Sequence, residues 1–220
     1  MIGAWQLPTT PQAIIDLIIA LLVWALTEAV GNAIMDHVLG KVFRGYVGKV
    51  PYGSTYKHFL EYAIDFGAHG TYTYAFTSSI AAGIGEEIMW FGAPMFVGWM
   101  ATHNLIATIA LMLASGVAWA GIHSFNYFDY ARRVRLYRYR WLAFGGAMGY
   151  YVPAAIGSIV MWLMGFGYVS IMLHTVYDLS ISLRETKLLK ERARLHREYQ
   201  VKGRRRVSPY AGESYVGEES

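Results

Sequence analysis

The feature that most constrains this chain is the placement of its basic residues. All 19 Lys and Arg lie in three segments, residues 36–58, 124–140 and 184–220, and none lies in residues 1–35, 59–123 or 141–183. A soluble protein carries basic side chains along every exposed helix face, whereas long apolar stretches without them are typical of helices that cross a bilayer. The pattern therefore predicts an integral membrane protein whose basic segments lie in water.

The composition agrees with this prediction and excludes several classes of protein. Hydrophobic residues make up 55% of the chain and charged residues only 15%, against roughly 25% charged in soluble domains. There is no Cys, which excludes a disulfide scaffold, a thiolate zinc site and a cysteine nucleophile. No motif indicates binding to nucleic acid, so we expect membrane lipid, and not nucleic acid, around the protein.

The apolar stretches predict an all-α, polytopic membrane bundle of about six spans. A run of 18 to 24 mostly apolar residues is long enough to cross about 30 Å of hydrocarbon. A loop with room for one short interfacial helix is expected at residues 36–58, and a tight turn at Gly165–Gly167. Residues 1–183 would form the membrane domain, followed by a charged helix and a disordered tail in 184–220. The expected spans are residues 12–35, 59–80, 81–100, 102–123, 141–164 and 166–183.

The charge bias also predicts an orientation. Ten of the basic residues lie in 184–220, and cytoplasmic segments are enriched in Lys and Arg. We therefore expect a plasma-membrane protein with a cytoplasmic C-terminus. Counting spans backwards puts segment 124–140 in the cytoplasm as well, but it puts 36–58 outside, where its four basic residues disagree with the rule.

Several ionisable residues lie inside the predicted spans, where each costs at least about 2.5–3.5 kcal/mol to insert. Glu86 and Glu87 are expected near the start of one span and His123 near the end of the next. Antiparallel neighbours would bring them to the same depth. His174 and Asp178 are four residues apart, so they share one helix face. The sequence therefore predicts that these side chains converge in one pocket near the cytoplasmic surface.

Such a pocket has coherent chemistry. A carboxylate can take a proton from water, a neutral imidazole can orient that water or polarise a carbonyl, and a further polar group can stabilise an oxyanion. Glu86, His123 and His174 would also suit a divalent metal such as zinc or iron. No cofactor is required by the sequence, and a divalent metal stays an open alternative.

Two other polar sets are interpreted differently. Glu61, Asp65 and His69 follow a spacing of four residues. They form a rival stripe for a metal or proton site, although the simpler interpretation is that they face the pocket or an aqueous groove. Glu28 and Asn32 are also four residues apart in the first span. Interhelical hydrogen bonds are the simpler interpretation of that pair.

The order of the pocket residues resembles that of the CPBP family, which comprises CAAX prenyl endopeptidases and bacteriocin-processing membrane proteins. The family's Glu-Glu-x-x-x-Arg motif is matched by Glu86 to Phe91, with Phe91 in place of the Arg. Its Phe-x-x-x-His motif is matched by Trp119 to His123, and its His-x-x-x-Asn/Asp motif by His174 to Asp178. The resemblance covers residues 80–183, the four-helix core of the family.

The resemblance implies roles for these residues. Glu86 would activate water with support from Glu87, His123 and His174 would position water or substrate, and Asp178 would hold the oxyanion or orient His174. A guanidinium at the motif Arg would pair with a carboxylate and fix its charge. Without it, one of the two glutamates is protonated more easily or another group compensates, so the chain is a divergent enzyme or a family member that has lost activity.

These observations lead to one expected function and two rivals. The expected function is a CPBP-type intramembrane endopeptidase that hydrolyses a peptide bond of a membrane-associated or lipidated substrate with glutamate-activated water. One rival is a non-catalytic subunit that keeps the fold and binds a membrane protein partner. The other is a metal-binding membrane subunit that uses Glu and His ligands.

Overall fold

The computed structural model describes residues 5–47, 71–133 and 137–201, and every regular element in these ranges is helical. This confirms the all-α prediction for the described part of the chain. The elements, in order, are α1 (Pro11–Val47), α3 (Tyr72–Glu87), the π-helix η1 (Ile88–Gly92), α4 (Ala93–Thr102), α5 (Leu105–Arg133), the 3-10 turn η2 (Tyr137–Tyr139), α6 (Arg140–Leu163) and α7 (Gly167–Val201).

Four helical stretches within the described residues are long and apolar enough to cross a membrane: Pro11–Gly40, Tyr72–Thr102, Leu105–Asp129 and Tyr137–Leu163. On α1, Ile14, Ile18, Leu22 and Leu26 are all exposed, and their spacing of four puts them on one helix face. An exposed apolar stripe of this length is costly in water and favourable in lipid. These helices are therefore consistent with a membrane location.

Residues 72–102 form one continuous helical stretch, because α3, η1 and α4 follow each other without a break. The expected boundary between spans at residues 80 and 81 is therefore wrong; residues 59–70 lie outside the described part. Polar residues do not interrupt the helix because their hydroxyls bond to backbone one turn back. Thr77 donates to the carbonyl of Thr73, Ser78 to that of Tyr74 and Ser79 to that of Ala75.

Three other expected boundaries were also displaced. Helix α1 continues to Val47, so residues 36–47 are helical and not a loop; glycines such as Gly40 only weakly disfavour a helix. Helix α5 continues ten residues beyond His123 to Arg133. Helix α7 runs unbroken across residues 183 and 184, which joins the predicted last span to the charged helix. Residues 202–220 lie outside the described part.

The tight turn between α6 and α7 is confirmed. Gly165 has φ of 84°, a left-handed conformation that glycine adopts without steric cost. The amide of Gly165 donates to the carbonyl of Trp162, and the amide of Phe166 donates to that of Met161. Phe166 and Met161 also pack in one buried cluster. This is a Schellman motif, which closes α6 and starts α7 within three residues.

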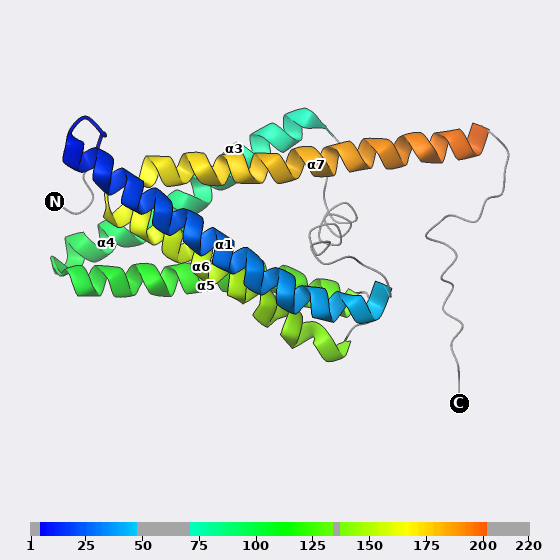
Figure 1. Cartoon of the computed structure of the whole chain (residues 1–220), viewed down its shortest axis with the longest axis horizontal. Helices are drawn as coiled ribbons and strands as arrows, with labels where there is room; N and C mark the ends of the chain where they lie inside the picture. The colour runs from blue at the N-terminus through cyan, green and yellow to red at the C-terminus, as the bar shows by residue number, and fades with distance from the viewer. Residues whose placement is uncertain (1–4, 48–70, 134–136, 202–220) are drawn as a thin grey trace.

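The helices form two groups that diverge from a common end (Figure 1). Helix α6 packs between α1 and α5, while α3 packs mainly along α7. The groups meet where η1 contacts α5 and α6 and where α6 contacts α7. The space between the groups therefore begins at η1, directly after Glu86 and Glu87.

Candidate functional site

The pairing of α3 with α7 brings the two glutamates to His174. Gly83 lies one turn before Glu87, and a side chain at this position would collide with Thr175 of α7. Because Gly83 has none, the two helices approach closely beside Glu87 and His174. Glu86 and Glu87 are at the centre of the continuous stretch 72–102 and not near the start of a span, as the sequence had indicated.

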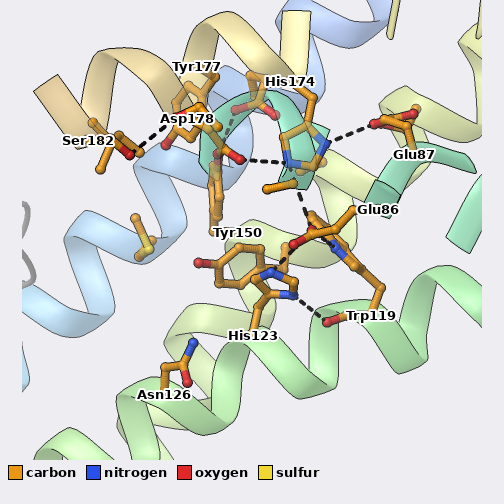
Figure 2. Close-up of a pocket in the computed structure, with 18 of the residues that line it drawn as sticks. Glu86, Glu87, Trp119, His123, Asn126, Tyr150, His174, Tyr177, Asp178 and Ser182 are labelled. Atoms are coloured by element: carbon orange, nitrogen blue, oxygen red, sulfur yellow. Dashed lines mark hydrogen bonds and ion pairs between the residues drawn. The ribbon is translucent and has the colours of Figure 1, made fainter. Parts of the chain in front are cut away.

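Glu86 is the focal point of the site (Figure 2). Its Oε2 accepts a hydrogen bond of 2.6 Å from the indole Nε1 of Trp119. The same oxygen lies 3.3 Å from Nε2 of His123 and 3.9 Å from Nε2 of His174. The side chain of Glu86 keeps 25% of its surface exposed. One carboxylate oxygen thus faces both imidazoles and an opening.

Glu87 is buried, with 1% of its surface exposed. It accepts hydrogen bonds from Ser158 Oγ at 2.9 Å and from Trp162 Nε1 at 2.8 Å, both on α6. Nδ1 of His174 lies 3.2 Å from Oε1 of Glu87. Buried carboxylates require such partners. Glu87 therefore ties α3 to α6 and α7 and orients His174, which leaves the more accessible Glu86 to meet a ligand.

The orientation of His123 is fixed by its own helix. Nδ1 of His123 lies 2.9 Å from the backbone carbonyl of Trp119. A carbonyl oxygen only accepts hydrogen bonds, so Nδ1 carries the proton and donates it. In the neutral ring Nε2 is then the basic nitrogen, and it is the atom that faces Glu86.

His174 is held between acids on two elements. While Nδ1 faces Glu87, Nε2 lies 3.6 Å from Oδ2 of Asp178, one turn further along α7, and 3.9 Å from Oε2 of Glu86. Figure 2 shows His174 reaching between Glu87 and Asp178, with His123 approaching Glu86 from α5. The predicted convergence of all five residues is therefore confirmed.

These residues line a cavity of about 290 Å³ between the two helix groups. One wall comes from α3 and α7 and carries small hydroxyl side chains, Ser78, Ser79 and Ser182. The other comes from α1, α5 and α6 and is largely aromatic, with Tyr127, Tyr150 and Tyr151 among the residues that line it.

The π-helix η1 directly follows the glutamate pair, and its cause is local. The amide of Ala93 donates to the carbonyl of Ile88, five residues back. The next residue, Pro94, has no N–H, and its ring crowds the carbonyl of Trp90; the change of register accommodates it. Single π turns of this kind are frequent at functional sites. Here the turn orients Gly92 toward the indole of Trp162, where a side chain would collide with the ring.

The motif departures at residues 91 and 119 are in contact. Phe91 is fully buried, and its ring packs edge-on against Trp119 with centroids 5.7 Å apart. Where the motif Arg would supply a donor, the indoles of Trp119 and Trp162 donate to Glu86 and Glu87. The motif position of residue 119 predicts only an aromatic ring there, and nothing in the sequence singles out Trp162 or Ser158, because Trp and Ser in apolar spans carry no distinct signal.

Comparison with known proteins adds no identification. No protein-family model, curated protein or solved structure matches this chain. The chemistry of the site is therefore argued from its geometry alone.

Two other predicted sets have different outcomes. Tyr150 on α6 donates a 2.9 Å hydrogen bond to Glu28 on α1, which confirms the expected interhelical bond for Glu28. Asn32 instead donates to the backbone carbonyl of Glu28 within α1. The rival stripe Glu61, Asp65 and His69 lies outside the described residues. Among the residues that are described, no group of three or more His, Asp or Glu side chains is arranged to hold a metal ion.

Proposed function

We propose that this protein is an intramembrane endopeptidase of the CPBP type, which hydrolyses a peptide bond of a membrane-associated or lipidated substrate. The observation that supports it most is the position of Glu86, whose Oε2 lies 3.3 Å and 3.9 Å from Nε2 of His123 and His174 at the edge of an open cavity. A water molecule at this point would have a base on one side and two imidazoles to hold it.

The reaction follows from these positions. Glu86 takes a proton from water as the water oxygen attacks the scissile carbonyl carbon, which forms the C–O bond and places negative charge on the carbonyl oxygen. In its protonated form His174 or His123 donates its Nε2–H to that oxygen and stabilises it. Collapse breaks the C–N bond, and Glu86 returns the proton to the leaving amine. One water is consumed, one carboxyl and one amino group are formed, and Glu86 ends as it began.

The buried acids would serve this reaction by positioning. Glu87 holds Nδ1 of His174, and Asp178 lies 3.6 Å from Nε2 of the same ring. A ring held by carboxylates at both nitrogens cannot rotate away from Glu86. Asp178 thus acts on His174 rather than on the oxyanion, because an ionised carboxylate would repel the developing charge.

The proposed setting is the plasma membrane, with about six spans and the C-terminus in the cytoplasm. Ten basic residues in 184–220 favour this orientation. Attachment of a reporter that is active only in the cytoplasm, such as a fluorescent protein, to the C-terminus tests it. The proposed orientation would be contradicted if the C-terminal fluorescent protein did not fluoresce while a reporter that is active only outside the cytoplasm, attached at the same position, were active.

The enzymatic proposal is tested with the full chain in lipid vesicles and a library of peptides. Incubation in oxygen-18 water places the isotope in each new C-terminal carboxyl group, which mass spectrometry detects. We expect Glu86→Gln to lower the rate by about 10²–10⁴-fold and His123→Ala to lower it strongly. Asp16→Asn is the matched control, since within the described ranges the side chain of Asp16 bonds to Gln12 on the surface of α1 and to no other residue. Unchanged cleavage in Glu86→Gln would refute the assignment.

A non-catalytic membrane subunit is the second candidate, and Phe91 favours it. This residue fills the position of the motif Arg with a fully buried ring, which is compatible with a fold kept for packing. In that case purification from native membranes would yield a stoichiometric protein partner, and no peptide in the library would be cleaved. For the metal-binding rival, elemental analysis of the purified chain would find about one equivalent of metal.

A further inference from the structure

The wall of the cavity opposite the glutamate pair carries a carboxylate that the proposed reaction does not use. Glu28 of α1 lines the same cavity as Glu86 and His174. Its Oε2 accepts the hydrogen bond from the Tyr150 hydroxyl. Its Oε1 accepts no hydrogen bond from any described residue, although the side chain is only partly exposed.

The surroundings of Glu28 suit a cation. The residues that line the cavity include no Lys and no Arg, and a phenol hydroxyl shares its hydrogen but does not neutralise a charge. A carboxylate with a free oxygen in a partly dry cavity is costly to leave without a counter-ion. The basic side chains of the cavity are the imidazoles of His123 and His174, and their ion pairs in the described part of the chain are with Glu86, Glu87 and Asp178 and not with Glu28. The cavity thus leaves the free oxygen of Glu28 without a Lys or Arg partner.

The aromatic rings beside Glu28 strengthen this preference. The ring of Tyr150 is stacked near Tyr177, with centroids 6.5 Å apart and an angle of 27°, and it meets Tyr151 edge-on at 4.9 Å. Tyr150 is buried, with 5% of its surface exposed, whereas Tyr177 is half-buried and lines the cavity. The ring of Tyr177 is therefore the one that can meet a Lys or Arg cation. Tyr177 is three residues from His174 on α7, so the ring pair connects Glu28 to the reacting residues.

We propose that Glu28, with the half-buried ring of Tyr177 beside it, forms a subsite that binds a cationic side chain, Lys or Arg, close to the scissile bond of a peptide substrate. This inference rests on the proposed function and names its substrate class. A cavity of about 290 Å³ is at the small end of the range for ligand pockets. It accepts a short stretch of peptide around one basic residue.

The test measures binding, so it does not depend on turnover. The full chain with Glu86→Gln, in lipid nanodiscs, is titrated calorimetrically with three capped pentapeptides that differ only at the centre: lysine, norleucine or glutamate. Norleucine keeps the aliphatic length of lysine without the charge. We expect the lysine peptide to bind about tenfold more tightly than the norleucine peptide, in line with a charge-assisted hydrogen bond, and the glutamate peptide to bind least.

Variants connect the preference to Glu28. Addition of Glu28→Gln should remove the tenfold advantage of lysine, whereas Asp16→Asn on the same helix should keep it. Tyr150→Phe removes the phenol donor but leaves the carboxylate, so it should also keep the preference. Equal binding of the lysine and glutamate peptides to the chain with Glu28 intact would overturn the subsite, and this result does not need the Glu28 variant to fold.

The two proposals fail in different ways. Cleavage by the wild-type chain with no preference for a basic residue would overturn the subsite and leave the peptidase standing. A Glu28-dependent preference for lysine, without isotope incorporation into any peptide, would support the subsite and contradict the peptidase.

Discussion

The buried carboxylate of Glu87 allows the sharpest test of the packing described above. It has 1% of its surface exposed and is held by Ser158, Trp162 and His174. Trp162→Phe removes the 2.8 Å bond from the indole and leaves Oε2 of Glu87 without a donor among the described residues. A buried acceptor that loses its partner costs about 1–3 kcal/mol, and more when it is charged.

A double-mutant cycle separates the free energy of the Trp162–Glu87 hydrogen bond from the free energy lost through poorer packing. Glu87→Met replaces the carboxylate by an apolar side chain of similar volume. In that background, Trp162→Phe lowers the free energy of unfolding only through the loss of packing of the ring atoms that it deletes. We expect the two single changes to destabilise the fold strongly and the double variant to be more stable than their sum predicts by about 1–3 kcal/mol. Denaturant unfolding of the full chain in detergent micelles, followed by far-ultraviolet circular dichroism, measures it.

A matched control is available on the surface. Trp141 is 61% exposed, and Trp141→Phe should change the unfolding free energy by less than about 0.5 kcal/mol. Additive effects of Trp162→Phe and Glu87→Met would refute the argument, because they would mean that the indole and the carboxylate do not stabilise each other.

Three further changes test separate features. Trp119→Phe deletes the 2.6 Å bond to Glu86 and should lower peptide cleavage by roughly tenfold or more, as expected for a bond to a charged group, with less effect on substrate binding; an unchanged rate would contradict the role of the indole. Gly83→Val introduces a side chain against Thr175 and should abolish cleavage, and a normal rate would show that the close approach is unnecessary. Ser124 is fully buried, and its hydroxyl has no hydrogen-bond partner in the described part of the chain, so Ser124→Ala should preserve or raise the melting temperature; a drop of several degrees would show a hidden partner.

The convergence of the site was predictable because burial of a charge is so costly. Glu86 and Glu87 have no basic residue nearby in sequence, so partners on other helices were required. The depth argument was wrong in its premise, because the two glutamates lie at the centre of the stretch 72–102 and not at the start of a span. The same reasoning anticipated the interhelical role of Glu28, but not its free oxygen, since that depends on where the cavity lies.

The lengths of the helices were harder to predict. The polar stretch around Ser78 and Ser79 reduced the apparent hydropathy of residues 59–80, yet the hydroxyls bond within their own helix and do not interrupt it. Glycines such as Gly40 were interpreted as loop residues although a helix accommodates them. A local pattern does not distinguish a glycine that ends a helix, as Gly165 does, from one that allows a close approach, as Gly83 does.

The contact between Phe91 and Trp119 gives the departures from the motif a common physical meaning. Taken separately, an aromatic ring in place of an Arg removes a charge, and a Trp in place of a Phe is a mild change. Because the two rings pack together, the larger indole brings its N–H to Glu86 while Phe91 fills the space behind it. Where the CPBP motif has a cationic donor, this chain thus offers Glu86 the neutral indole N–H of Trp119 together with the imidazoles of His123 and His174.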